Sequence, residues 1–187
     1  MEHYNLMNNY ITFYNDVLPK EFCDIIIQKY EDDNGKELIE NSNMRFTQLN
    51  INTSSQWKDI VKNLMHNCFI PLIERYKKEF NINQFPKEYV YEQLRIKKYM
   101  PNGLDEFKLH VDVEDHQTAK RFLVFFVYLN DNERGLTCFP DYDIKVTPKA
   151  GRVLMFPPLW THRHYAEKPI KEPKYILGSY LHYVGAL

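Results

Sequence analysis

The chain has 187 residues, of which 44% are hydrophobic, and its 24 lysines and arginines nearly balance its 25 aspartates and glutamates. That length suits one domain that buries most of its apolar surface. The net charge of −1 argues against a protein that binds duplex nucleic acid through phosphate contacts, because such proteins normally carry a basic stripe.

The cysteines and the start of the chain bear on the cellular compartment. Cys23, Cys68 and Cys138 are widely spaced and odd in number, which is typical of reduced thiols in a cytosolic protein. The first residues lack the basic and then apolar pattern of a signal peptide. No apolar run approaches the ~20 residues that span a bilayer. We therefore expect a soluble cytoplasmic protein (in the host cytoplasm if it is viral) with no membrane partner.

The first 87 residues carry mainly helical signals. A short segment rich in β-formers at 10–14 precedes a helix expected over 19–31, with a proline in its first turn and apolar residues at helical spacing. Residues 36–43 are polar, which predicts a loop. Residues 45–51 alternate in polarity and are a predicted strand.

A long helix with one apolar stripe is expected next. Thr53 and Gln56 have the spacing of a capping box, which places the start of the helix there. Pro71 lies inside the pattern, so the helix should kink or restart at that point and end near Phe80. The stripe is interpreted as packing against a sheet.

From about residue 88 the pattern changes to strands. Residues 88–99 alternate over a long span, as one strand would. Short β-like segments separated by turn residues follow at 107–110, 121–129, 136–139, 144–147, 152–156, 160–164 and 174–183. Many short strands at this spacing predict a sandwich or barrel. We expect one domain over 1–187, with helical support over about 1–87 bracing one sheet of a mainly β core over 88–187.

Two side chains near the end of one predicted strand are placed to share a metal ion. His110 and Asp112 lie two residues apart on an extended segment and therefore point to the same side. An imidazole from a distant strand, His162 or His164, would complete a set of two histidines and one carboxylate. That ligand set leaves open the positions where ferrous iron binds a cosubstrate and O2. The residues thus predict an iron oxygenase.

Five sequence blocks make this prediction more specific. They are His110-Val111-Asp112, residues 126–130, residues 148–152, His162-Arg163-His164 and Lys174-Tyr175. In order and approximate spacing the chain resembles the iron(II)/2-oxoglutarate dioxygenases. Its prolyl 4-hydroxylase branch, which includes small phage-encoded members, is the most similar. The resemblance covers about 92–183 and implies a double-stranded β-helix, or jelly-roll, with iron at its mouth.

The resemblance also implies which residues bind the metal. His110 and Asp112 would be the first two ligands, and His164 is preferred as the third. The reason is that the family places its 2-oxoglutarate-binding cation about ten residues after the distal histidine, where Lys174 stands. His162 is the fallback. The same three ligands would be the catalytic residues, and Asp112 favours hydroxylation over halogenation because it leaves no halide site.

The cosubstrate pocket follows from the same resemblance. Lys174 would bind the far carboxylate of 2-oxoglutarate as a fixed cation. Tyr128 would donate its hydroxyl to that carboxylate, and Tyr99 would line the pocket. On the substrate side, Arg152 matches a basic family position and His116 lies in a polar loop just past the ligands.

Two positions depart from the family pattern. Thr137 stands where the family often has a Gly-Gly-Glu-Thr turn, but here it follows Arg134-Gly135-Leu136, without the acidic residue. Tyr180 stands where many relatives have tryptophan. These changes leave the expected metal ligands intact and alter the walls around them.

The implied reaction couples decarboxylation of 2-oxoglutarate to succinate and CO2 with hydroxylation of a C–H bond by O2 at Fe(II), and leaves ascorbate open as an accessory reductant. A proline-containing peptide or protein is the substrate class that the resemblance implies. The same chemistry on a nucleobase, an amino acid or another small molecule is a second reading. A non-catalytic metal-binding jelly-roll is a third, and Lys174 argues against it, because a metal binder needs no buried cation.

Overall fold

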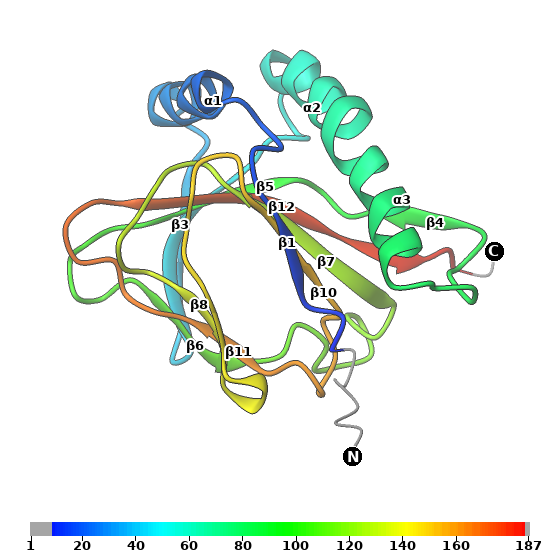
Figure 1. The fold of residues 1–187 in the computed structure, drawn as a ribbon. Coiled ribbons are helices and arrows are strands. Elements are labelled where there is room, and N and C mark those ends of the chain that lie inside the picture. The colour runs from blue at the N-terminus through cyan, green and yellow to red at the C-terminus, as the bar shows by residue number, and fades with distance from the viewer. Residues whose placement is uncertain (1–8, 186–187) are drawn as a thin grey trace.

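The computed structural model describes residues 9–185 and shows one curled, mainly antiparallel sheet with helices on one side (Figure 1). The strands are β1 (Thr12–Tyr14), β2 (Glu37–Glu40), β3 (Met44–Asn50), β4 (Tyr89–Tyr91), β5 (Arg95–Tyr99), β6 (Glu106–His110), β7 (Arg121–Tyr128), β8 (Thr137–Phe139), β9 (Ile144–Val146), β10 (Val153–Phe156), β11 (His164–Ala166) and β12 (Lys174–Tyr183). The helical segments are α1 (Lys20–Asp32), η1 (Ser55–Trp57), α2 (Lys58–Leu64), the π-helical turn η2 (Met65–Phe69), α3 (Ile70–Glu79) and the 3-10 turn η3 (Pro140–Tyr142). This is the predicted jelly-roll with flanking helices.

The sheet runs in the order β1-β10-β7-β12-β5-β3-β6-β11-β8-β9, with β2 added at β3 and β4 at β12. Because the sheet curls, β6, β8 and β11 come to lie across from β7 and β12 (Figure 1). Strand β3, from the first half of the chain, lies between β5 and β6. A boundary at residue 87 therefore does not separate helices from sheet.

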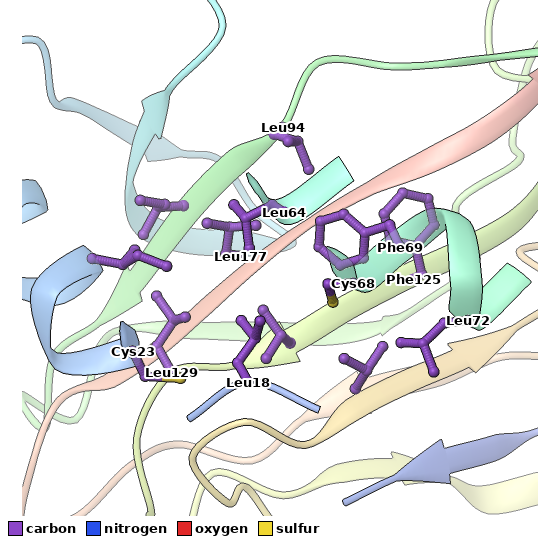
Figure 2. Close-up of a cluster of buried hydrophobic side chains, with 14 of the residues drawn as sticks. Leu18, Cys23, Leu64, Cys68, Phe69, Leu72, Leu94, Phe125, Leu129 and Leu177 are labelled. Carbon is purple, nitrogen blue, oxygen red and sulfur yellow. The ribbon is translucent and has the colours of Figure 1, made fainter. Parts of the chain in front are cut away.

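The main apolar core lies between the helices and the sheet. Leu64 at the end of α2 and Cys68 and Phe69 in η2 point towards Phe125 on β7 and Leu177 on β12 (Figure 2). The rings of Phe69 and Phe125 are 4.6 Å apart. This packing confirms that the predicted helical stripe covers the sheet, and it leaves the opposite, concave side of the sheet for the site.

Two predictions in the first half were wrong. Residues 36–43 were expected as a loop, but β2 pairs with β3, and the side chain of Asn41 accepts hydrogen bonds from the backbone of Asn43 and Met44 in the turn. Pairing with a neighbouring strand thus outweighs the polar local sequence.

The capping box was also wrong, because the Thr53 hydroxyl donates to the carbonyl of Asn50, and the helical segment starts only at Ser55, with Ser54 as an N-cap that makes no side-chain hydrogen bond. The restart at Pro71 takes the form of a π-helical turn just before it, which accommodates the missing N–H of proline.

Two strand boundaries in the second half also differ. The predicted strand over 88–99 is interrupted between β4 and β5, where the backbone N–H of Leu94 donates to the side chain of Asn52. The predicted strand over 160–164 begins only at His164, because the N–H of His162 closes a turn on the carbonyl of Leu159. His162 and His164 therefore do not share a strand face.

Candidate active site

Three potential metal ligands converge at the open end of the curled sheet. His110 ends β6 and His164 begins β11, and the two residues are direct cross-strand partners. Asp112 follows two residues after His110, where its backbone N–H donates to the carbonyl of Pro158 at 3.1 Å. Among residues 9–185, ligand atoms of His110, Asp112 and His164 lie within 4.8 Å of one another.

Hydrogen bonds assign the tautomer of both histidines. Nδ1 of His110 lies 2.7 Å from the carbonyl of Lys108, and Nδ1 of His164 lies 3.0 Å from the carbonyl of His162. A carbonyl oxygen only accepts, so each Nδ1 carries the proton and each Nε2 keeps a lone pair. Phe107 stacks on His110 with ring centroids 3.4 Å apart, which fixes that imidazole.

Asp112 is held by one of its oxygens. Its Oδ1 accepts a hydrogen bond of 2.7 Å from the hydroxyl of Tyr180. Its Oδ2 is buried, has no hydrogen-bond partner within residues 9–185 and lies 3.6 Å from Nε2 of His164. The Tyr180 ring is in turn covered by the Arg121 guanidinium at 4.0 Å, and Arg121 donates to the backbone carbonyl of Asp112.

This donor set suits a cation. Two imidazole lone pairs and a buried carboxylate oxygen face one another with no hydrogen-bond donor among them, an arrangement that is costly unless a metal ion completes it. Burial raises the pKa of Asp112, but the attraction of His164 and His110 outweighs it and holds that pKa below its usual range. Burial lowers the pKa of His164 to about 4, so this imidazole is neutral near pH 7 and free to bind a metal.

A small inner cavity leads from these ligands to a buried lysine. Lys174 opens β12, is 1% exposed and donates to the carbonyl of Gly135 at 2.6 Å. Its ammonium lies about 5.5 Å from the ring centres of Tyr99 and Tyr128. Burial lowers the pKa of Lys174 to about 7. Because the part of the chain that the structure describes offers one acceptor for its three N–H groups, Lys174 is suited to receive an anion in this cavity.

The two predicted tyrosines behave differently. Tyr99 lines the inner cavity, where burial raises the pKa of its hydroxyl. Tyr128 is fully buried and donates to the hydroxyl of Thr137 at 2.7 Å, so it is Thr137 that reaches the cavity wall. Gly135 and Thr137 belong to the turn that departs from the family pattern. That departure was the sequence signal that could have pointed to these two residues as part of the cavity wall.

The remaining predicted residues lie elsewhere. His162 points away from the ligands, with Nδ1 at 2.8 Å from the Thr161 hydroxyl and Nε2 at 2.7 Å from the carbonyl of Asn9. Arg152 binds the side chain of Asn15 and does not line either cavity beside the ligands, which argues against a substrate contact. His116 is exposed in the loop after Asp112 and is likewise outside the lining of both cavities.

A larger outer cavity of about 390 Å³ opens on the other side of the ligands. Its wall comes from the β2–β3 hairpin, from β5 and β6, and from the loop after Asp112. Lys97 lines both cavities and was not singled out from the sequence. Its place two residues before Tyr99 on one strand face was the signal that could have found it.

The comparison with protein families agrees with this geometry. Residues 94–182, which contain all three ligands, Tyr180 and Lys174, match the model of the 2OG-Fe(II) oxygenase superfamily. The matched residues make up a little under half of the chain, so the similarity to this superfamily covers the part that carries the candidate site. The protein is a 2-oxoglutarate- and iron(II)-dependent dioxygenase, and Fe(II), 2-oxoglutarate and O2 are the cofactor and cosubstrates of this enzyme class. No curated protein matches the sequence.

Solved structures of prolyl hydroxylases share the fold of this dioxygenase. A viral collagen prolyl hydroxylase from Paramecium bursaria Chlorella virus-1, solved with 2OG, is 18% identical with a TM-score of 0.68 and covers 95% of this chain and 98% of its own. A prolyl hydroxylase from Trichoplax adhaerens, in complex with a hypoxia inducible factor peptide fragment, is 15% identical with a TM-score of 0.73 over 94% of this chain and 84% of its own. A Pseudomonas putida prolyl-4-hydroxylase is 12% identical with a TM-score of 0.64 over 95% of both chains.

Within residues 9–185, no helix combines the length and the apolar character that crossing a bilayer requires.

Proposed function

We propose that this dioxygenase hydroxylates a proline residue in a peptide or protein. The observation that carries the proposal is the outer cavity, which is lined by His110 and Asp112 and lies between the β2–β3 hairpin and the loop after Asp112. A trough with walls from two separate segments can accept an extended chain. Prolyl hydroxylases with the same fold across nearly the full length of this chain support a peptide as the substrate.

We assign the metal to His110, Asp112 and His164, and the far carboxylate of 2-oxoglutarate to Lys174. The lone pairs on Nε2 of both histidines and the unpartnered Oδ2 of Asp112 support the first assignment. The buried ammonium of Lys174, 2.6 Å from one carbonyl, supports the second. Bound iron(II) supplies the oxidative decarboxylation of 2-oxoglutarate to succinate and CO2, coupled to hydroxylation of a C–H bond by the same O2.

The chain itself contributes position and charge. Carbonyl groups of Lys108 and His162 accept hydrogen bonds from Nδ1, so Nε2 of each imidazole is the nitrogen left to bind the metal. Tyr180 keeps one oxygen of Asp112 occupied, which directs the other towards the metal. Lys174 and Tyr99 fix the orientation of the cosubstrate and exclude water from the inner cavity.

We also propose a cytoplasmic location, which the three buried free cysteines support.

The test is an assay with purified protein, Fe(II), 2-oxoglutarate and ascorbate against proline-rich peptides and the same peptides with proline replaced by alanine. We expect the proline-rich peptides, unlike their alanine versions, to stimulate succinate formation and to gain one oxygen atom. His110→Ala and Asp112→Ala should abolish both signals. Stimulation by a free amino acid or nucleobase, with none by any peptide, would replace the peptide substrate with a small molecule. Undiminished succinate in both variants would refute the enzyme assignment.

A further inference from the structure

Strand β5 presents a row of polar side chains to the concave side of the sheet. Arg95 lines the outer cavity, Tyr99 lines the inner cavity, and Lys97 between them lines both. Lys97 lies opposite Gln48 on β3 and Ile176 on β12. It therefore occupies the junction between the cosubstrate cavity and the outer cavity.

The surroundings of the Lys97 ammonium are aromatic. Nζ lies 4.9 Å from the ring centre of Phe46 and 5.6 Å from that of Phe107, which itself stacks on His110. Within residues 9–185 the ammonium has no hydrogen bond and no ion pair. Asp112 attracts it from beyond ion-pair distance.

The other cations of the outer cavity are already paired. Arg121 binds Glu92 with two nitrogens, at 2.6 and 3.0 Å, and Arg95 approaches the same carboxylate at 3.8 Å. Among residues 9–185, Lys97 differs from both in having no carboxylate within ion-pair distance, and the rings of Phe46 and Phe107 lie beside its ammonium. Burial lowers its pKa to about 8 although Asp112 attracts the charge. An ammonium that lines a cavity and has no carboxylate in contact with it is available to an anionic ligand, so we expect its partner to come from a ligand.

We propose that Lys97 binds a carboxylate of the substrate. The inference rests on the proposed function in one respect: in a prolyl peptide the carboxylate is an Asp or Glu side chain, or the chain terminus, within two residues of the target proline. The two phenylalanine rings form the apolar side of this subsite and Lys97 its charged end. Lys97 is thus a residue that sets substrate specificity, distinct from Lys174 at the cosubstrate end.

The test compares peptides that differ only in charge. In each pair, one peptide carries glutamate and the other carries glutamine at the same position within two residues of proline. The value of kcat/KM is obtained from the rate at which hydroxylated peptide forms. We expect the wild-type enzyme to prefer the glutamate peptide by about tenfold at one of these positions. Lys97→Met should remove the preference and Lys97→Arg should retain it. Lys145→Met, which removes an exposed lysine outside both cavities, should keep the preference unchanged.

A second measurement needs no peptide turnover. The protein is loaded with Mn(II) and N-oxalylglycine, a 2-oxoglutarate analogue, and titrated by calorimetry with N-acetylproline, which has a free carboxylate, and with its amide. We expect the carboxylate to bind more tightly than the amide in the wild type and in Lys97→Arg. In Lys97→Met the two should bind alike.

The outcomes separate this inference from the proposed function. Hydroxylated peptides without any acidic preference would overturn the role of Lys97 and keep prolyl hydroxylation. If no peptide is hydroxylated but N-acetylproline binds in a way that depends on Lys97, the role of Lys97 stands and prolyl hydroxylation is wrong. If Lys97→Met weakens binding of 2-oxoglutarate and leaves the glutamate preference intact, the anion at Lys97 is the cosubstrate, and the inference is wrong.

Discussion

The two sides of the curled sheet differ in how completely the chain itself supplies partners for polar side chains. On the helix side, the carboxylate of Asp33 accepts hydrogen bonds from the indole of Trp57, the amide of Gln56 and the backbone of Gly35 at 2.5 to 2.8 Å. On the same side the exposed carboxylate of Glu31 also accepts hydrogen bonds, from Lys98 and Tyr175. Every one of these groups is satisfied by the chain itself.

On the concave side, several partners are missing. Among residues 9–185, Asp112 leaves one buried oxygen without a donor, Lys97 has no counter-ion, and Lys174 has one acceptor for three N–H groups. The helix side is thus stabilised by contacts within the chain, whereas the proposed metal and two carboxylates would supply the partners that the concave side lacks. Five experiments test this contrast.

The largest effect should come from the metal ligands. Asp112→Ala should weaken Co(II) or Fe(II) binding by more than about 100-fold, because it removes the one anionic ligand. Equilibrium dialysis measures this directly. Asp115→Ala is the matched control, since Asp115 also lines the outer cavity but bonds only within its own turn. Equal metal affinity in both variants would show that the concave side does not need a cation.

Next in size is the cosubstrate cation. Lys174→Met should raise the Kd for 2-oxoglutarate by roughly 10- to 100-fold, because a charge-assisted hydrogen bond in a buried site is lost. Calorimetry with the metal-loaded protein measures it. Lys171→Met removes an exposed lysine paired with Glu133 and should leave the Kd unchanged. A normal Kd in Lys174→Met would place the far carboxylate elsewhere.

On the helix side the expected effect is on stability alone. Asp33→Ala should lower the free energy of unfolding by about 2 kcal/mol, because it leaves the buried N–H of Trp57 without an acceptor. Chemical denaturation measures it. Asp32→Ala, which affects an exposed carboxylate, should change it by less than about 0.5 kcal/mol. If Asp33→Ala weakened metal binding instead, the two sides would not be independent.

A smaller effect is expected for Tyr180, which touches the metal site only through Asp112. Tyr180→Phe should weaken metal binding by about tenfold, because Asp112 loses the donor that orients it. The absorption spectrum of the Co(II) protein should also shift as the carboxylate geometry changes. Tyr183→Phe on the same strand is the control, since that side chain is half exposed. An unchanged spectrum and affinity in Tyr180→Phe would contradict this positioning role.

The smallest effect is a pH dependence. Burial sets the pKa of Lys174 to about 7 in the ligand-free protein, and a bound carboxylate would raise it. Binding of 2-oxoglutarate should therefore be strongest below about pH 7 and weaken as the pH rises through that value, by at most about tenfold per pH unit. Lys174→Arg should flatten the dependence, because a guanidinium stays protonated. Affinity that increases with pH would exclude an ammonium partner.

Local pattern predicted most elements of this fold, and the misses have physical reasons. Alternation and turn residues located β6, β7 and β12, since those strands carry their own polarity signal. The polar segment of β2 has no such signal and becomes a strand only because β3 offers backbone partners. The capping box at Thr53 failed because the helical segment starts only at Ser55, with Ser54 as its N-cap, so Thr53 lies before the cap and its hydroxyl donates to the carbonyl of Asn50.

The sequence by itself determined the chemistry that this protein can perform, because the two-residue spacing of His110 and Asp112 and the ten residues from His164 to Lys174 are properties of the chain. Only the tertiary structure decided between His164 and His162, since the choice depends on which imidazole stands opposite His110 when β6 and β11 pair. It also decided that Lys97 is left without a partner and that Tyr180 binds Asp112. Such contacts join residues far apart along the chain, and no local pattern encodes which side chains a curled sheet brings face to face.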